Sequence, residues 1–159
     1  ALKGVFTSLE WRINSVNALR VAQERGVSIQ ENKNPHIDGF QSLVSVTLRS
    51  NDKSICVEGT VFANDDPRIV SIDGFRIDAI PSGHVLISRN IDSPGVIGFI
   101  GTVLGEHKIN IAAMFNSREN IGGNALTVYN IDDPISEDIH KQLKSDDRIT
   151  DIYYISLTK

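Results

Sequence analysis

The sequence has little that would tie it to an oxidising compartment or to nucleic acid. Its single cysteine, Cys56, excludes an internal disulfide and a cysteine metal cluster. Basic residues are in the minority, with 16 Lys and Arg against 20 Asp and Glu and a formal net charge of -4. Because a surface that binds nucleic acid needs a concentrated basic face, this balance argues against such a partner. A reducing, cytoplasmic location fits these absences best.

Long hydrophobic runs are also missing. No apolar stretch reaches the roughly 18 residues that a membrane span requires, and the first residues, ALKGVFTSLEWR, lack the pattern of a secretion signal. We therefore predict no membrane partner. The sequence begins without methionine, and its first residues already read as the middle of a folded segment. We therefore expect a piece of a longer polypeptide. With 40% hydrophobic and 23% charged residues, the composition is that of one globular domain or two small ones.

The first half combines one helix pattern with several strand patterns. Residues 15–26, SVNALRVAQERG, have helical apolar spacing and end in a glycine suited to a left-handed turn. The apolar positions are Val16, Leu19 and Val21. β-branched, partly alternating segments predict strands at 27–33, 42–49 and 54–62. Asp73-Gly74 lies between two apolar runs and predicts a type I′ hairpin, because both residues tolerate positive φ. We expect a helix on an antiparallel sheet.

The second half has a more regular order of elements. The patterns predict, in turn, a strand at 84–90, a helix at 93–108, strands at 110–118 and 124–131, a helix at 134–146 and a strand at 148–157. This β-α-β-β-α-β order is the ferredoxin-like arrangement, in which two helices cover one face of a four-stranded antiparallel sheet. Pro81 and Gly83 mark the joint between the halves. The predicted fold class is thus α+β, with domains at 1–82 and 83–159.

Glycines at 95, 98, 101 and 105 raise the question of a nucleotide-binding loop. A dinucleotide fingerprint has the spacing G-x-G-x-x-G within a unit of parallel strands. Here the spacing differs and the following strand continues into a predicted hairpin, so we disfavour that interpretation. On a helix, Gly98, Gly101 and Gly105 form a stripe opposite the apolar face. Since each glycine costs about 1 kcal/mol of helix stability relative to alanine, we interpret the stripe as a surface for a neighbouring helix or a second subunit.

The residues before this stripe predict an anion site at the start of the helix. Asp92 or Ser93 can cap the helix, and Pro94 suits its first turn. The amides that would then point outward, at the positive end of the helix dipole, are those of Gly95, Val96 and Ile97. The alternative is that the cap alone satisfies these donors and nothing binds.

Three motifs of the second half carry a resemblance to a known family. D-x-P-G-V-I-G, L-G-x-x-x-I-N-I-A and G-G-x-A-L, taken together, resemble an ACT domain, specifically that at the C-terminus of D-3-phosphoglycerate dehydrogenases. In the first half, SVNALRVAQERG and GTVFANDDPRIVSIDGFRIDA resemble the intervening domain of the longer form of those enzymes. The resemblance also implies a strand upstream of Ala1, so we expect the first domain to be incomplete.

The resemblance implies a regulatory fragment that has no catalytic residues of its own. It would be the effector-sensing and oligomerising part of an NAD-dependent oxidoreductase of L-serine biosynthesis, with NAD bound by catalytic domains that this chain lacks. The expected partners are L-serine or a related small amino acid and further copies of the chain, which would form a homodimer or a higher homo-oligomer through the ACT domain. We expect no cofactor in this chain. We expect no metal either, because the four histidines, His36, His84, His107 and His140, lack metal-ligand spacing.

The same resemblance assigns site residues. The serine-binding positions of the family fall on Asn90 and Asp92, and on Asn110 of a neighbouring subunit. A second, anionic effector site in the first domain would include Arg68, although an ion pair between Arg68 and an acid such as Asp66 is the simpler alternative.

Two other functions stay open at this stage. One is the regulatory part of an iron–sulfur L-serine dehydratase, which combines related domains. The other is a purely structural dimerisation module that binds no ligand. The segment GTVFANDDPRIVSIDGFRIDA favours the dehydrogenase over the dehydratase.

Overall fold

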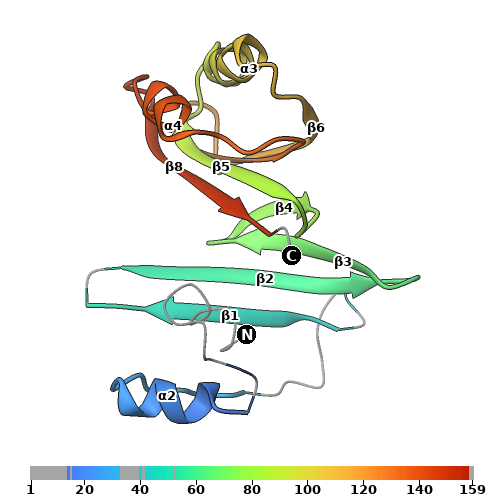
Figure 1. The fold of residues 1–159 in the computed structure, drawn as a ribbon, viewed down its shortest axis with the longest axis vertical. Helices are drawn as coiled ribbons and strands as arrows, with labels where there is room; N and C mark the ends of the chain where they lie inside the picture. Colours follow the sequence, from blue (N-terminus) through green and yellow to red (C-terminus); the bar gives the residue numbers. More distant parts are fainter. Residues whose placement is uncertain (1–13, 15, 33–39, 41, 52, 158–159) are drawn as a thin grey trace. The chain divides into compact units, whose positions relative to one another are not determined.

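The computed structural model describes residues 14, 16–32, 40, 42–51 and 53–157 (Figure 1). The chain forms two compact units, Ala1–Gly39 and Phe40–Lys159. The second unit contains two four-stranded sheets, so the α+β class predicted from the sequence is confirmed. No helix within the described residues is long and apolar enough to cross a membrane.

The described part of the first unit contains one short helix, α2 (Ala18–Glu24). Gly26 follows it with a φ of 73°, which confirms the predicted left-handed turn. The predicted apolar stripe is wrong: α2 buries Ala18 and Ala22, four residues apart, whereas Leu19 is 50% exposed and Val16 89%. The predicted strand at 27–33 is also wrong in its described part, since residues 27–32 form no strand.

The first sheet is an antiparallel meander. Its strands are β1 (Val44–Arg49), β2 (Ser54–Phe62), β3 (Asp66–Ile72) and β4 (Phe75–Ala79), in the order β1-β2-β3-β4. The turn between β3 and β4 is the predicted one, with φ of 49° at Asp73 and 85° at Gly74. The carboxylate of Asp73 accepts a hydrogen bond from the Cys56 amide at 2.6 Å, which ties this turn to β2.

The second sheet has the predicted ferredoxin-like topology. Its elements are β5 (His84–Ile91), α3 (Val96–Glu106), β6 (Ile111–Arg118), β7 (Asn124–Ile131), α4 (Glu137–Leu143) and β8 (Ile149–Ser156). The strand order is β6-β7-β5-β8, and every neighbouring pair is antiparallel. Helix α4 begins at Glu137 rather than near Pro134, because the Ser136 hydroxyl accepts a hydrogen bond from the Ile139 amide and so caps the helix.

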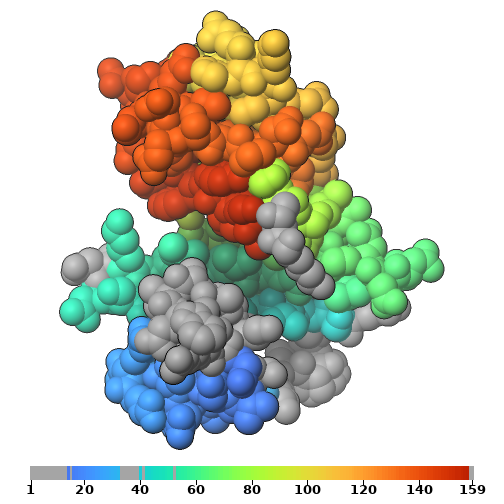
Figure 2. Space-filling view, in the orientation of Figure 1, coloured from blue at the N-terminus to red at the C-terminus, as the bar shows by residue number. Residues whose placement is uncertain are grey.

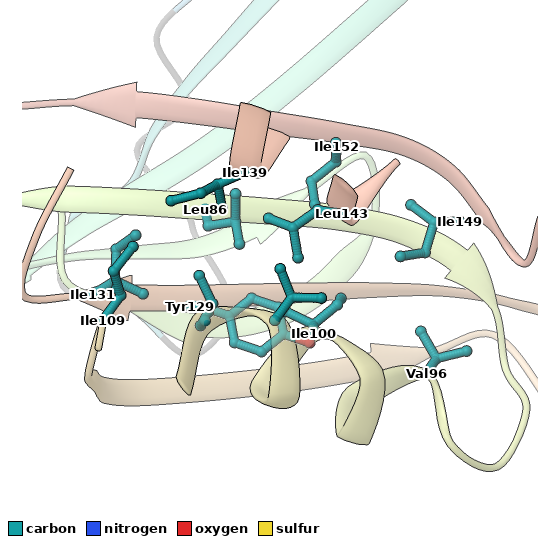
Figure 3. Close-up of a cluster of buried hydrophobic side chains, with 12 residues drawn as sticks. Leu86, Val96, Ile100, Ile109, Tyr129, Ile131, Ile139, Leu143, Ile149 and Ile152 are labelled. Atoms are coloured by element: carbon teal, nitrogen blue, oxygen red, sulfur yellow. The ribbon is translucent and has the colours of Figure 1, made fainter. Parts of the chain in front are cut away.

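One face of this sheet packs against the two helices. Tyr129 of β7 and Leu86 of β5 are fully buried there, beneath Ile100 of α3 and Leu143 of α4 (Figure 3). The cluster also holds Val96, Val103, Leu104, Ile109, Ile131, Ile139, Ile149 and Ile152. Each helix therefore contributes one apolar side to this core, whereas Ile97 of α3 is 40% exposed.

The other face of the second sheet is buried as well. A second cluster joins Ile72, Phe75, Ile77 and Ala79 of the β3–β4 hairpin to Val85, Leu126 and Val128 of the second sheet. As a result β7 is buried at every position from Ala125 to Ile131. The loop at 80–83 joins the two sheets where the sequence predicts a boundary, and the sheets on either side of it share this core.

Candidate functional site

The β5–α3 loop enters its helix through a left-handed residue. Gly95 has φ 93° and ψ -13° and occupies the N-cap position of α3, without a side-chain cap. The prediction that Asp92 or Ser93 caps the helix, with Pro94 in its first turn, is therefore wrong. The Ser93 hydroxyl instead donates to the Ile91 carbonyl at 3.4 Å. Glycine is favoured at residue 95 because a residue with a side chain is strained at this φ.

The first amides of α3 are nonetheless open donors. The Val96 amide makes one long hydrogen bond of 3.5 Å, to the Ser93 carbonyl. In the described part of the chain, no group accepts from the amides of Gly95 and Ile97. These donors lie at the positive end of a helix of 11 residues, which is favourable for an anion. Anion binding at this point stays a prediction.

Arg148 adds a positive charge at the same place. Its guanidinium donates to the Pro94 carbonyl at 2.8 Å, and its Nε donates to the Asp146 carboxylate at 2.8 Å. Hydrogen bonds from the Arg148 side chain and backbone amide lower the pKa of Asp146 to about 2. The turn before β8 is thereby held against the start of α3. In the sequence, only the spacing of two residues between Asp146 and Arg148 indicates this pair, and nothing links Arg148 to Pro94.

Asp92 is bonded within its own chain. Its carboxylate accepts hydrogen bonds from the Arg118 guanidinium at 2.8 Å and from the Gly122 amide at 3.2 Å. Both bonds, that of Arg118 foremost, lower the pKa of the Asp92 carboxyl. Arg118 ends β6 and Gly122 lies in the turn before β7, so 26 and 30 residues separate them from Asp92. Nothing in the local sequence around Asp92 pointed to either partner.

Asn90 lies on the helix-facing side of β5 and is 6% exposed. Its amide donates to the Ile91 carbonyl at 2.9 Å. The buried hydroxyls of Ser88 and Thr127 lie close by, together with that of Tyr129, which has no hydrogen-bond partner in the described structure. Burial raises the pKa of the Tyr129 hydroxyl. Asn90 thus belongs to a buried polar cluster, whereas Asp92 borders the surface.

Asn110 lies at the other end of the sheet. Its amide donates to the Asp132 carboxylate at 2.8 Å. In the pairing with β7, Asn90 lies opposite Ala125, whereas Ile111 lies opposite Ile131. Six residues of strand correspond to about 20 Å. A single chain therefore does not bring Asn110 to Asp92.

Arg68 forms an ion pair with Asp66, which was the simpler alternative to an anionic effector site. Two of its nitrogens donate to the Asp66 carboxylate at 3.0 Å, and a third donates to Asp78 at 3.1 Å. These carboxylates raise the pKa of Arg68. The carboxylates of Asp66 and Asp78 thus accept hydrogen bonds from the Arg68 guanidinium that an anionic effector would otherwise use.

The glycine stripe of α3 is open in a single chain. A methyl group added at Gly98, Gly101 or Gly105 would meet no atom within 4 Å among the described residues. Figure 2 shows α3, in yellow, at the surface. Nearby, β6 is an edge strand whose only partner among the described strands is β7. As for metals, His36 lies outside the described residues, which contain no group of three or more candidate ligands.

Comparison with known proteins identifies related sequences. Residues 1–73 match the family model for the D-3-phosphoglycerate dehydrogenase intervening domain. The chain is 39% identical over 159 residues to D-3-phosphoglycerate dehydrogenase of Archaeoglobus fulgidus, with 98% of this chain and 30% of that protein covered. It is 35% identical over 145 residues to the Bacillus subtilis enzyme, with 91% and 28% covered. The chain thus spans about 30% of the length of these relatives.

Proposed function

Because the chain is related to D-3-phosphoglycerate dehydrogenases over nearly all of its length, we propose that it is a regulatory part of such an enzyme, which binds L-serine where two ACT domains meet. The proposed parent is a cytoplasmic, NAD-dependent oxidoreductase whose hydride transfer and NAD site lie outside these 159 residues. The relatives favour this parent over an L-serine dehydratase.

The observation that carries the proposal is the pairing of opposite charges in the β5–α3 loop. The open amides of Gly95 and Ile97 suit a carboxylate. The Asp92 carboxylate, three residues earlier and ionised at neutral pH, suits an ammonium group. A free amino acid carries both groups within a few ångströms, so one ligand can satisfy both. A purely acidic or purely basic pocket would not select it.

A second copy of the chain would complete the site. Asn110 is too far from Asp92 to act within one chain, so its expected role requires a neighbour. Among the described strands, β6 is paired on one side only, which leaves its other edge available for another strand. The glycine stripe of α3 lets another backbone approach closely. We propose that two sheets join side by side with their helices on one face, so that a ligand bound across the joint would favour association.

Calorimetric titration with L-serine tests the ligand. The wild-type chain should show saturable binding, with weaker or no binding of D-serine and of L-serine amide, which lacks the carboxylate charge. Asp92→Asn should weaken L-serine binding at least tenfold. This factor corresponds to the lower end of the free energy expected for a hydrogen bond to a charged group. Asp138→Asn is the matched control, since Asp138 lies on α4 with a side chain that is 95% exposed. Equal binding by both variants would contradict the role of Asp92.

Light scattering with and without L-serine tests the two-copy site. The wild-type chain should self-associate in the micromolar range, and L-serine should promote this. Asn110→Ala should weaken ligand binding and ligand-promoted association together. A dimer that gives no heat and no thermal shift with any amino acid would instead support the purely structural dimerisation module.

A further inference from the structure

A surface pocket of about 370 Å³ lies between the β3–β4 turn and the end of β6. Residues Asp73 to Arg76 line one side, and residues Ser117 to Glu119 line the other. The pocket lies where the two sheets of the second unit meet, at one end of their shared core. Neither the predicted effector residues nor Arg68 line it.

Two arginines supply most of the hydrogen-bonding capacity of the pocket. Arg76 is exposed, and no hydrogen bond or ion pair joins its guanidinium to a described residue. Arg118 uses one guanidinium nitrogen for Asp92 and keeps its other donors. The half-buried Ser117 adds a hydroxyl that makes no hydrogen bond to a described residue. Three sets of donors thus border one space.

The acids that line the pocket are already bonded. One carboxylate oxygen of Asp73 accepts from the Cys56 amide and the other pairs with Arg89. One oxygen of Glu119 accepts from the Asn124 amide at 3.1 Å. The pocket therefore offers open donors from two cations, whereas most of its acceptor oxygens are occupied. Such a set of donors selects an oxyanion, because a guanidinium binds carboxylate or phosphate with two parallel hydrogen bonds.

We propose that this pocket is a binding site for a small oxyanion, a carboxylate or phosphate group, held between Arg76 and Arg118 with Ser117 as a further donor. This site is separate from the amino-acid site in the β5–α3 loop, and its binding does not depend on that proposed function.

Arg118 would couple the two sites. It is the foremost partner of Asp92, and it also lines the pocket. An oxyanion that draws the Arg118 guanidinium toward Arg76 weakens its bond to Asp92, which then accepts an ammonium group more readily. Binding of the oxyanion and of an amino acid would therefore be mutually favourable, since such linkage is reciprocal. This coupling, unlike the pocket itself, rests on the proposed function.

Titration of the full chain with inorganic phosphate and with malonate, followed by amide NMR shifts, tests the site. Sodium chloride at matched ionic strength is the reference. We expect saturable shifts at Gly74 and Ser117 with at least one of the two probes, and the stronger probe identifies the preferred group. Arg76→Gln should weaken binding about five- to tenfold, as expected for a partly exposed charge-assisted contact. Arg49→Gln is the control, since Arg49 is an exposed arginine of the same sheet.

Each outcome decides a separate point. The proposal is overturned if neither probe exceeds chloride, or if the shifts of the wild-type chain map away from the pocket. It is overturned as well if folded Arg76→Gln binds like Arg49→Gln. Arg76→Lys, which keeps the charge but loses the planar fork, should fall between wild type and Arg76→Gln. Oxyanion binding without any effect of L-serine would retain the pocket and reject the coupling.

Discussion

Replacement of Gly95 by alanine probes the start of α3 most directly. The φ of 93° lies in the left-handed region, where a residue with a Cβ is strained by about 1–2 kcal/mol. The added methyl would lie 3.3 Å from a guanidinium nitrogen of Arg148. That nitrogen ends a flexible side chain, so we expect it to shift and add little. Gly95→Ala should therefore lower the free energy of unfolding by about 1–2 kcal/mol.

Gly98→Ala is the matched control, three residues further along the chain. Its methyl would meet no atom within 4 Å, and the residue lies inside the helix. Alanine inside a helix is more stable than glycine by about 0.5–1 kcal/mol. The same chemical change should thus have opposite signs at the two positions, and the two variants should differ by about 2 kcal/mol.

Urea unfolding measures the free energy of unfolding of both variants. The protein concentration must be low enough for light scattering to show a monomer. Two outcomes would refute the reasoning: a neutral Gly95→Ala would mean that the helix does not need a left-handed cap, and a destabilised monomeric Gly98→Ala would mean that this face of α3 is packed. At higher concentration, Gly98→Ala should weaken self-association, because the added methyl keeps a second backbone away.

Three further predictions concern the core, an ion pair and NAD. Leu126→Ala, at a fully buried position that packs against the β3–β4 hairpin, should cost about 2–5 kcal/mol in urea unfolding. It should also speed amide exchange in β4, and unchanged exchange there would contradict a shared core. Because folding lowers the pKa of Asp146 from 3.8 to about 2, its ion pair with Arg148 stabilises the fold above pH 3.8 and is lost as the pH falls through 2. Asp146→Asn should thus be less stable than wild type at neutral pH and approach it toward pH 2, and a constant difference between the two would reject the lowered pKa. A fluorescence titration should find no saturable binding of NADH to this chain, since its glycines start a helix between antiparallel strands, and saturation would overturn that interpretation.

The sequence predicted the second half of the chain more closely than the first. Strand β7 occupies the predicted residues 124–131, and the Asp73-Gly74 turn has the predicted conformation. Both signals are local, because a short apolar run bounded by a turn and a positive φ each depend on a few neighbouring residues. The prediction failed for α2, where two alanines rather than the larger apolar residues are buried. Alanine is too weakly hydrophobic for its burial to be inferred from spacing alone.

For the candidate site, the sequence determined which residues carry the chemistry, and the tertiary structure decided what each of them contacts. The motif around Asp92 and Gly95 is contiguous, so its place between a strand and a helix follows from local patterns. The bond from Arg118 to Asp92 spans 26 residues, and the bond from Arg148 to Pro94 spans 54. The burial of both faces of the second sheet likewise depends on a hairpin from the first sheet. Contacts between distant segments depend on how the sheets pack, and short-range periodicity carries no information about that packing.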